Sequence, residues 1–244
     1  MAYNEFVRCT TGLPGLEKFV DSKDVMPDML TAPVGPVAPS ERPAIRVKAV
    51  PERDRRRLLM HFLALGESDR LLRFGSILPD ELITRYVQHL DFNRDTVFGV
   101  YDDKLHLVGV GHLAFTPMES LPRGQDGERA AEFGVSVSES ARGMGVGSKL
   151  FERAAMHCRN AEIDTLYMHC LSSNRVMMHI AKKAGMAIQR DRGEADAYLK
   201  LPPASPGTVL REAVEEQVAS LDYTMKAQAR AAKKLLGTLP GFKN

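Results

Sequence analysis

Tryptophan is absent from the 244-residue sequence, and cysteine occurs only three times, as Cys9, Cys158 and Cys170. A small, odd number of cysteines without Cys-x-x-Cys spacing argues against a disulfide framework and against a structural zinc site. We therefore expect a reduced protein without a bound metal, which corresponds to a cytoplasmic setting.

Long apolar runs and an excess of one charge are missing as well. No stretch approaches the roughly 18 uninterrupted apolar residues of a transmembrane helix, and no apolar run follows the early Glu5, as one would in a signal peptide. The 33 basic and 31 acidic residues leave a formal net charge of +2, so no strong field attracts nucleic acid or an anionic membrane. Neither is expected as a partner.

The chain divides by composition into three parts. Residues 31–43 form a proline-rich run that regular helix cannot accommodate, so we predict a flexible Pro-rich N-terminal extension at 1–44. Residues 45–201 predict a globular domain. Residues 202–244 predict a C-terminal helical extension.

Apolar periodicity over residues 45–201 predicts an α/β domain. Alternating or short apolar segments predict strands, and apolar residues spaced three and four apart predict helices. The predicted strands are 45–50, 96–101, 105–115, 130–137, 165–171, 187–190 and 195–201. The first predicted helix begins at Pro51, and three further helices span 79–90, 145–160 and 174–184. The order β-α-α-β-β-β-α-β-α-β-β favours a mixed sheet with helices on both faces.

The C-terminal extension carries a helical apolar stripe. Acidic residues near its start and basic residues near its end match the helix dipole. The stripe needs a partner, and two readings stay open: the helix packs on its own domain, or it serves as a homodimerisation arm. The stripe consists of Leu210, Val214, Val218, Leu221, Met225, Ala229 and Ala232.

The segment with the clearest chemistry is a glycine-containing loop between a strand and a helix. Val135 to Val137 ends the predicted strand, and 142–147 reads Arg-Gly-Met-Gly-Val-Gly. Glycines let backbone N–H groups converge on an anion, and the N-terminus of the following helix adds partial positive charge. The loop lacks the Lys-Ser/Thr of a P-loop and the GxGxxG spacing of a dinucleotide fold, so it predicts another kind of pyrophosphate site.

Two motifs at the right separation resemble the GNAT superfamily of N-acetyltransferases. Residues 142–147 match its R/Q-x-x-G-x-G/A motif, and Asn174 stands eleven residues before Gly185, with Met186 where phenylalanine is usual. The resemblance covers about residues 45–201. It implies a mixed, mostly antiparallel sheet, acetyl-CoA as co-substrate, no metal, and an amine as acceptor.

Within the superfamily, the sequence is similar to the bacterial protein-lysine acetyltransferase branch. Segments 68–74, 78–82 and 91–95 resemble the first helical region of that branch, and 131–135 resembles its glutamate-bearing strand. The acceptor that this likeness implies is a protein lysine. A small-molecule amine stays open, because substrate need not follow a likeness of pattern.

The resemblance also implies roles for individual residues. Glu132 is the candidate general base, since a carboxylate there takes a proton from an incoming ammonium once burial raises its pKa; a surface strand glutamate is the alternative reading. The backbone amides of Val135 and Val137 are expected to face the pantetheine arm and the thioester carbonyl. The other candidate cofactor-binding residues are Arg142, Gly143, Met144, Gly145, Val146, Gly147, Ser148 and Asn174.

One departure from the family pattern lies at Ala181, where many GNAT enzymes carry a tyrosine that protonates the leaving thiolate. A thiol with a pKa of about 8.5 leaves tolerably as a thiolate, so the reaction does not require this acid. The expected function is therefore direct attack of a primary amine on acetyl-CoA. An acetyl-CoA-binding regulatory or scaffold protein with little turnover is the alternative.

Overall fold

The computed structural model describes residues 44–115 and 129–236. The predicted N-terminal extension lies outside these ranges apart from Ala44, so its boundary stays a prediction. All elements below belong to the unit that begins at Ile45. Among the described helices, none has the length and apolar composition that crossing a bilayer would require.

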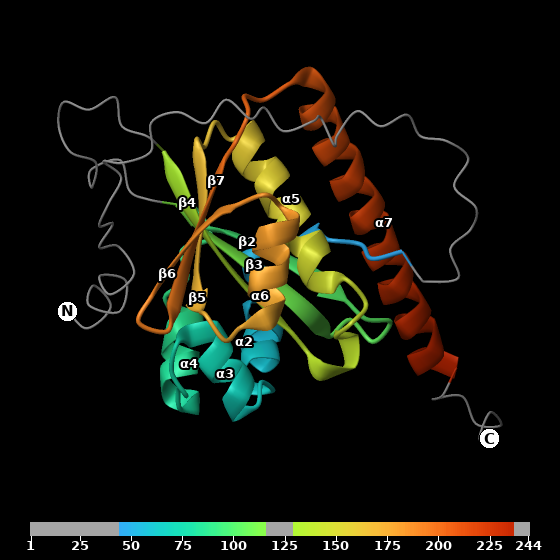
Figure 1. Ribbon diagram of the computed structural model, residues 1–244. Coiled ribbons are helices and arrows are strands. Elements are labelled where there is room, and N and C mark those ends of the chain that lie inside the picture. Colours follow the sequence, from blue (N-terminus) through green and yellow to red (C-terminus); the bar gives the residue numbers. More distant parts are fainter. Residues whose placement is uncertain (1–43, 116–128, 237–244) are drawn as a thin grey trace. The chain divides into compact units, whose positions relative to one another are not determined.

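Seven strands form one sheet in the order β1-β2-β3-β4-β5-β7-β6 (Figure 1). All neighbours pair antiparallel except β4 and β5, which run parallel. This confirms the predicted mixed, mostly antiparallel sheet. The strands are β1 (Lys48–Ala49), β2 (Thr96–Tyr101), β3 (Leu107–Phe115), β4 (Ala130–Val137), β5 (Thr165–Leu171), β6 (Ala187–Asp191) and β7 (Glu194–Lys200).

Helices cover both faces of this sheet, as predicted. Helices α2 and α4 pack together on one face of the sheet, where α2 contacts β3. On the other face, α5 contacts β2, β3 and β4, and α6 lies beside α5 (Figure 1). The helices are α2 (Arg55–Leu63), α3 (Glu67–Phe74), α4 (Asp80–Gln88), α5 (Val146–Asn160), α6 (Arg175–Lys183) and α7 (Pro206–Leu236), with short 3-10 turns η2 (Glu52–Asp54) and η4 (Glu139–Ala141).

Two apolar clusters fill the space between sheet and helices. Phe133, Leu150 and Met168 belong to the cluster under α5 and α6, and Leu58 and Phe62 belong to the one under α2 and α4. Each side chain is less than 2% exposed. Burial of such side chains contributes roughly 1.5–3 kcal/mol each, so the two clusters hold the sheet between its helical layers.

Two local predictions were incomplete. The strand expected at 45–50 is reduced to Lys48–Ala49. On the edge of β1 that faces away from β2, the Ala49 N–H donates to Glu216 Oε2 of α7 at 3.1 Å, in place of a bond to another strand. Three α-helices, where two were expected, precede β2. Helix α3 was not predicted as a separate helix from periodicity, although segment 68–74 was recognised as resembling a helical region, and its eight residues bury no side chain fully.

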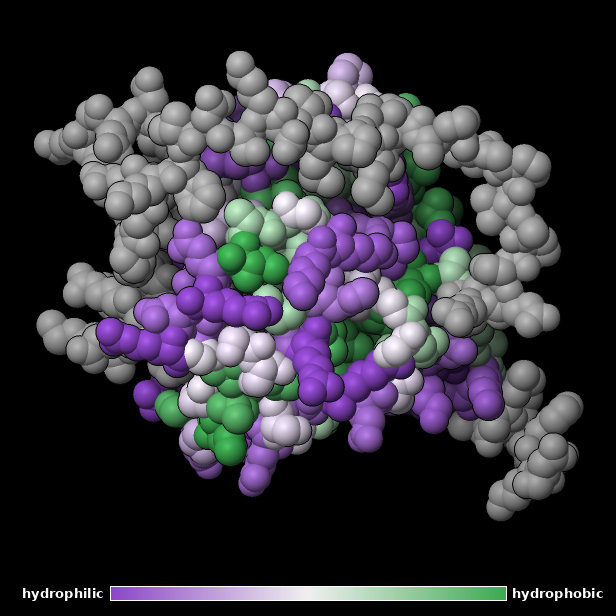
Figure 2. Space-filling model, viewed as in Figure 1, coloured by the Kyte–Doolittle hydropathy of each residue, from purple (hydrophilic) through white to green (hydrophobic). Residues whose placement is uncertain are grey.

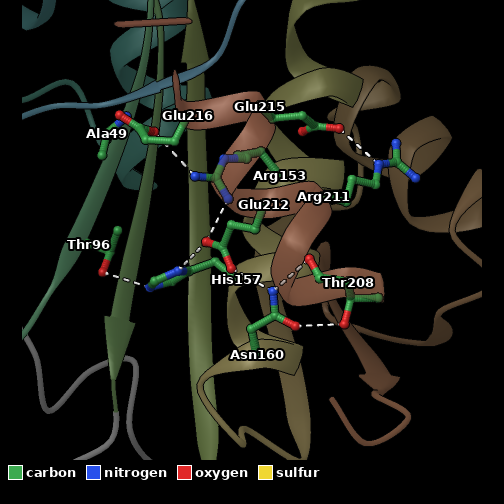
Figure 3. A network of polar contacts seen from close by, with 10 residues as sticks. All are labelled: Ala49, Thr96, Arg153, His157, Asn160, Thr208, Arg211, Glu212, Glu215 and Glu216. Carbon is green, nitrogen blue, oxygen red and sulfur yellow. Dashed lines mark hydrogen bonds and ion pairs between the residues drawn. The ribbon is translucent and has the colours of Figure 1, made fainter. Parts of the chain in front are cut away.

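The C-terminal helix α7 is held by a buried cation on α5. Arg153, 4% exposed, lies with Nη1 2.6 Å from Glu212 Oε1 and donates from Nη2 to Glu216 Oε2 at 3.2 Å (Figure 3). Its guanidinium also lies over the ring of Phe98, with Cζ 5.1 Å from the ring centroid. The helix thus packs on its own domain, as one of the two readings expected, and it does so through charged groups.

Two neighbours on α5 complete this contact. His157 Nδ1 donates to Glu212 Oε1 at 2.7 Å, and Asn160 Nδ2 donates to Glu212 Oε2 at 2.6 Å (Figure 3). Burial raises the pKa of Glu212, but these hydrogen bonds and the charges of His157 and Arg153 outweigh it and lower the pKa to about 2. The resulting stabilisation is present above the unfolded pKa of about 4.3 and is lost as the pH falls toward 2.

Replacement of Arg153 tests this docking. Arg153→Met should lower the free energy of unfolding by about 2–4 kcal/mol, because it removes the buried cation that Glu212 and Glu216 share and leaves them only Lys48 and His157 as ion-pair partners. Lys149→Met, on the same helix, removes an exposed pair with Glu152 and should cost less than about 0.5 kcal/mol. Urea denaturation of both variants is the measurement. Equal losses would contradict the role of Arg153.

Candidate active site

The predicted glycine loop connects η4 to the N-terminus of α5. Gly143 and Gly145 have φ values of +71° and +88°, the left-handed region that glycine enters without a steric penalty. Gly145 is also the N-cap of α5, and no side chain caps this helix start. The N–H groups of the first turn of α5 are therefore left without a capping side chain, an arrangement suited to an anion. Ser148, a predicted contact, is half-buried within the first turn of the helix.

Strands β4 and β5 diverge beside this loop. Their pairing runs only from Ala130 to Glu132 on β4, whereas β4 pairs with β3 as far as Val137. The Ser138 N–H donates to Val108 O on β3, and in an antiparallel ladder alternate residues point their backbone groups to opposite sides. Val135 and Val137 therefore direct their N–H groups toward the side that β5 has left.

Other predicted residues surround the same region. Arg142 pairs with Asp69 of α3, while Met144 is exposed and Val146 is buried. Asn174 is the N-cap of α6: its Oδ1 accepts from the Met177 N–H at 3.1 Å, and its Nδ2 lies 3.5 Å from Leu72 O. The position of Asn174 is thus explained by helix capping. Figure 2 shows hydrophobic atoms in a recess between α6 and the segment leading into α5, with hydrophilic atoms around it.

Glu132 lies where the parallel pairing of β4 and β5 ends. It is half-buried and stands opposite Tyr167 on β5, on the face of β4 that turns away from α5. Burial raises the pKa of the Glu132 carboxyl, the charges of Arg73 and His169 lower it, and Asp196 raises it again; the net shift is upward. A carboxylate with a raised pKa is a stronger base than an exposed one.

A carboxylate missed by the sequence analysis lies two strands away. Asp196 Oδ1 on β7 accepts from the Tyr167 hydroxyl at 2.6 Å and from His169 Nδ1 at 2.8 Å. Register places Tyr167 beside Glu132 and Asp196 beside His169, so these groups share one face of the sheet. The available signal was the alternation in Ala195-Asp196-Ala197, which places a polar side chain on one face of a strand.

A second residue missed by the sequence analysis is Arg73 of α3. Its guanidinium lies over β4, among aromatic rings of α2, α3 and α4. Its Cζ is 5.8 Å from the ring centroid of Phe62, 5.0 Å from that of Phe74 and 5.9 Å from that of Tyr86. A Cβ added to Gly134 would come within 2.8 Å of this carbon. Glycine at 134, two residues after Glu132, therefore leaves room for the guanidinium. A glycine inside a strand was the available signal.

From Arg73 a chain of hydrogen bonds runs into β3. Arg73 Nη2 donates to the Tyr86 hydroxyl at 3.1 Å, Tyr86 donates to His112 Nδ1 at 3.0 Å, and His112 Nε2 donates to Asp95 Oδ2 at 3.2 Å. Burial lowers the pKa of His112, which keeps the ring neutral and Nδ1 free to accept. Each ring nitrogen of His112 thus has a partner within the domain, Tyr86 on one side and Asp95 on the other.

Ser136 bonds a neutral histidine on the same face of β4. His61 Nδ1 donates to Leu107 O at 2.9 Å, so its Nε2 accepts from the Ser136 hydroxyl at 2.8 Å. Burial lowers the pKa of His61 to about 4. The pair ties α2 to the strand that carries Glu132.

Ala181 occupies the position of the family's tyrosine. It is 1% exposed and belongs to the apolar cluster under α6. A tyrosine side chain has no room there without displacing that cluster. Within the ranges that the structure describes, no group of three or more His, Cys, Asp or Glu could hold a metal ion.

A profile of the Acetyltransferase (GNAT) family matches residues 58–186, more than half of the chain. The match includes β4, the glycine loop and Asn174. The chain therefore belongs to the GNAT acetyltransferase family, in which the acyl group comes from acetyl-CoA.

Solved structures share this fold. The GNAT domain of PAT from S. lividans is 20% identical, with a TM-score of 0.53 over 64% of this chain and 89% of that chain. An N-acetyltransferase from Staphylococcus aureus Mu50 is 15% identical (TM-score 0.50, 66% of this chain, 100% of that chain). A putative acetyltransferase from Acinetobacter baylyi ADP1 is 14% identical (TM-score 0.50, 66% and 95%). Identities this low show the fold alone. No curated protein matches the chain.

The placement of Arg73 predicts its influence on Glu132. Arg73→Met keeps the length of the side chain but removes a positive charge that lowers the Glu132 pKa, so that pKa should rise further. Carboxyl-carbon NMR titration measures it, with Glu132→Gln to assign the signal. Arg85→Met, an exposed arginine on α4, should leave the pKa unchanged. A lower or unchanged pKa in Arg73→Met would contradict the placement.

Proposed function

We propose that the protein transfers the acetyl group of acetyl-CoA directly to a primary amine, with Glu132 as general base. The observation that carries this proposal is the divergence of β4 from β5. It leaves backbone N–H groups free next to an uncapped helix start, and it puts a carboxylate of raised pKa at the point of divergence.

The residues around the loop fit the pyrophosphate and pantetheine of the co-substrate. We assign the pyrophosphate to the backbone of 142–148, where Gly143 and Gly145 hold the left-handed turn and α5 presents its N-terminus. The N–H groups of Val135 and Val137 would donate to the pantetheine arm and to the thioester carbonyl. We propose that Arg142 and Asn174 lie beside the bound co-substrate. In the structure, Arg142 pairs with Asp69, and Asn174 caps α6 by accepting from the Met177 N–H.

The chemistry then requires a neutral amine. Glu132 accepts a proton from the ammonium of the acceptor, directly or through water, and the freed nitrogen lone pair attacks the thioester carbonyl carbon. Acetyl-CoA, when bound, would supply the acetyl thioester. Its carbon–sulfur bond breaks to release a thiolate, which takes up, directly or through water, the proton that the new amide nitrogen loses. A backbone N–H from β4 stabilises the charge that develops on the carbonyl oxygen. The buried Ala181 supplies no acid, and a thiolate leaves without one.

The acceptor should be cationic, because carboxylates line the face that carries Glu132. Asp196 lies on that face, and Glu194 precedes it by two residues on the same strand. A protein lysine agrees with the sequence likeness to the bacterial protein-lysine branch, and a small amine fits the same charge. A cytoplasmic location and the lack of a nucleic-acid partner stay predictions from composition.

A second candidate function is regulatory binding of acetyl-CoA with little turnover, favoured by the apolar packing of Ala181 where the family places its acid. Thiol release from acetyl-CoA, measured with a panel of lysine peptides and small amines, separates the two functions. Release that no acceptor stimulates would leave only the regulatory function.

The loop assignment predicts a charge effect at Gly145. Gly145→Asp should weaken acetyl-CoA binding at least about tenfold relative to Gly145→Asn, because only aspartate opposes the pyrophosphate. Asparagine has the same shape and tolerates the left-handed backbone, so it controls for strain. Isothermal titration calorimetry gives both affinities. Equal affinities would show that the pyrophosphate lies elsewhere.

The base assignment predicts a pH-dependent loss. Glu132→Gln should keep acetyl-CoA affinity and lower turnover about 10²–10⁴-fold near neutral pH. The loss should shrink at high pH, where more of the amine is neutral. Because the Glu132 pKa is raised, the wild-type rate should fall as the pH drops through that value, and the variant should lack this limb. Glu139→Gln, an exposed glutamate before the loop, should behave as wild type. Full activity of Glu132→Gln at every pH would exclude Glu132.

A further inference from the structure

The long helix α7 is amphipathic in the reverse of the usual sense. The side that meets the domain is largely polar: Thr208 is buried, Glu212 meets Arg153, and Lys226 Nζ donates to Tyr101 O at 3.1 Å. Ala219 and Tyr223 add apolar contacts on this side, and the Tyr223 ring packs on Tyr101. The apolar stripe recognised in the sequence faces outward instead. Exposed fractions are 66% for Leu210, 51% for Val214, 63% for Leu221 and 69% for Met225.

These four side chains form one continuous strip, which we call the α7 strip. Their spacing of four, seven and four residues repeats every eleven residues, or three turns, so they stay on one side of the helix. The outward positions between and beside them are also exposed and uncharged, and the exposed Arg211, paired with Glu215, lies at the edge of the strip. The uncharged positions are Ala213, Gln217, Thr224, Gln228, Ala231 and Ala232.

A face of this kind indicates an interaction surface. Apolar side chains scattered over a surface need no explanation, but a contiguous apolar strip that avoids every charge does. The charged residues of α7 could have faced water, yet Glu212 and Glu216 are turned inward toward Arg153 (Figure 3). The helix therefore keeps its apolar side for a contact beyond its own described domain.

We propose that the α7 strip binds the α7 strip of a second copy of this chain, with the two helices antiparallel. The strip is symmetric about the midpoint between Gln217 and Val218. An antiparallel pair centred there places Leu210 opposite Met225 of the second copy, and Val214 opposite Leu221 of the second copy. Large apolar side chains then meet on both sides of the centre, where Gln217 lies opposite Val218 of the second copy, and each contact occurs twice, as in any isologous pair.

The contact between Leu210 and Met225 is about 22 Å long, at 1.5 Å per residue. A single helix pair of that length is small among specific interfaces, so we expect a dimer with a micromolar dissociation constant. This inference is independent of the proposed chemistry, since the strip and the candidate active site share no residue.

The first experiment is sedimentation equilibrium of the full chain over about 1–200 μM. The wild type should pass from monomer to dimer. Leu221→Lys should raise the dissociation constant at least about a hundredfold, because symmetry introduces the charge twice. Met60→Lys places the same change on a residue of similar exposure on α2 and should leave dimerisation unchanged. A monomeric wild type, or a dimer that Leu221→Lys does not weaken, would overturn the proposal.

Cysteine cross-linking tests the orientation. In a Cys9→Ser background, where Cys158 and Cys170 are buried, Val214→Cys and Leu221→Cys chains are oxidised separately and as a mixture. The proposed register predicts disulfide dimers in the mixture, with little cross-linking of either variant alone. Strong cross-linking of each variant with itself would indicate a parallel pair and contradict the register. Full acetyltransferase activity of a monomeric Leu221→Lys chain would leave the proposed function untouched.

Discussion

The short parallel pairing between β4 and β5 is the constraint on which the functional part of this structure depends. Parallel pairing ends at Glu132, while β4 continues along β3 for five more residues. A strand that loses one neighbour in the middle of a sheet exposes backbone groups that are normally satisfied. Here those groups belong to Val135 and Val137, and the chain then runs into the glycine loop and the start of α5. One geometric feature thus places backbone donors, the helix dipole and a carboxylate beside each other.

The charged groups that influence Glu132 come from elements that are distant from β4 in the sequence. Arg73 reaches β4 from α3 because Gly134 leaves room for it, and Asp196 comes from β7 through the sheet register. The charge of Arg73 lowers the pKa of Glu132, whereas burial raises it, and burial has the larger effect. A base in such a setting depends on long-range packing, so changes in α3 or β7 act on the same carboxyl as changes in β4.

Helix α7 shows how a buried cation determines which side of a helix meets the domain. Arg153 is almost fully buried on α5, and a charge in that position requires a partner of opposite sign. Glu212 and Glu216 supply it, and they draw the polar side of α7 inward. The apolar stripe is consequently left on the outside. The same ion pairs therefore secure the helix and create the surface that we assign to a second copy.

The sequence by itself determined the class of fold and the segments of the candidate site. The strands at 130–137 and 165–171 appear at the predicted residues, because alternating apolar residues bounded by turns are a local signal. The glycine loop was readable for a similar reason, since its backbone needs glycine whatever surrounds it. Arg73, Asp196 and the outward direction of the α7 strip were decided only by the tertiary structure. Each depends on which residues distant in the sequence come into contact, and periodicity along one segment carries no information about that.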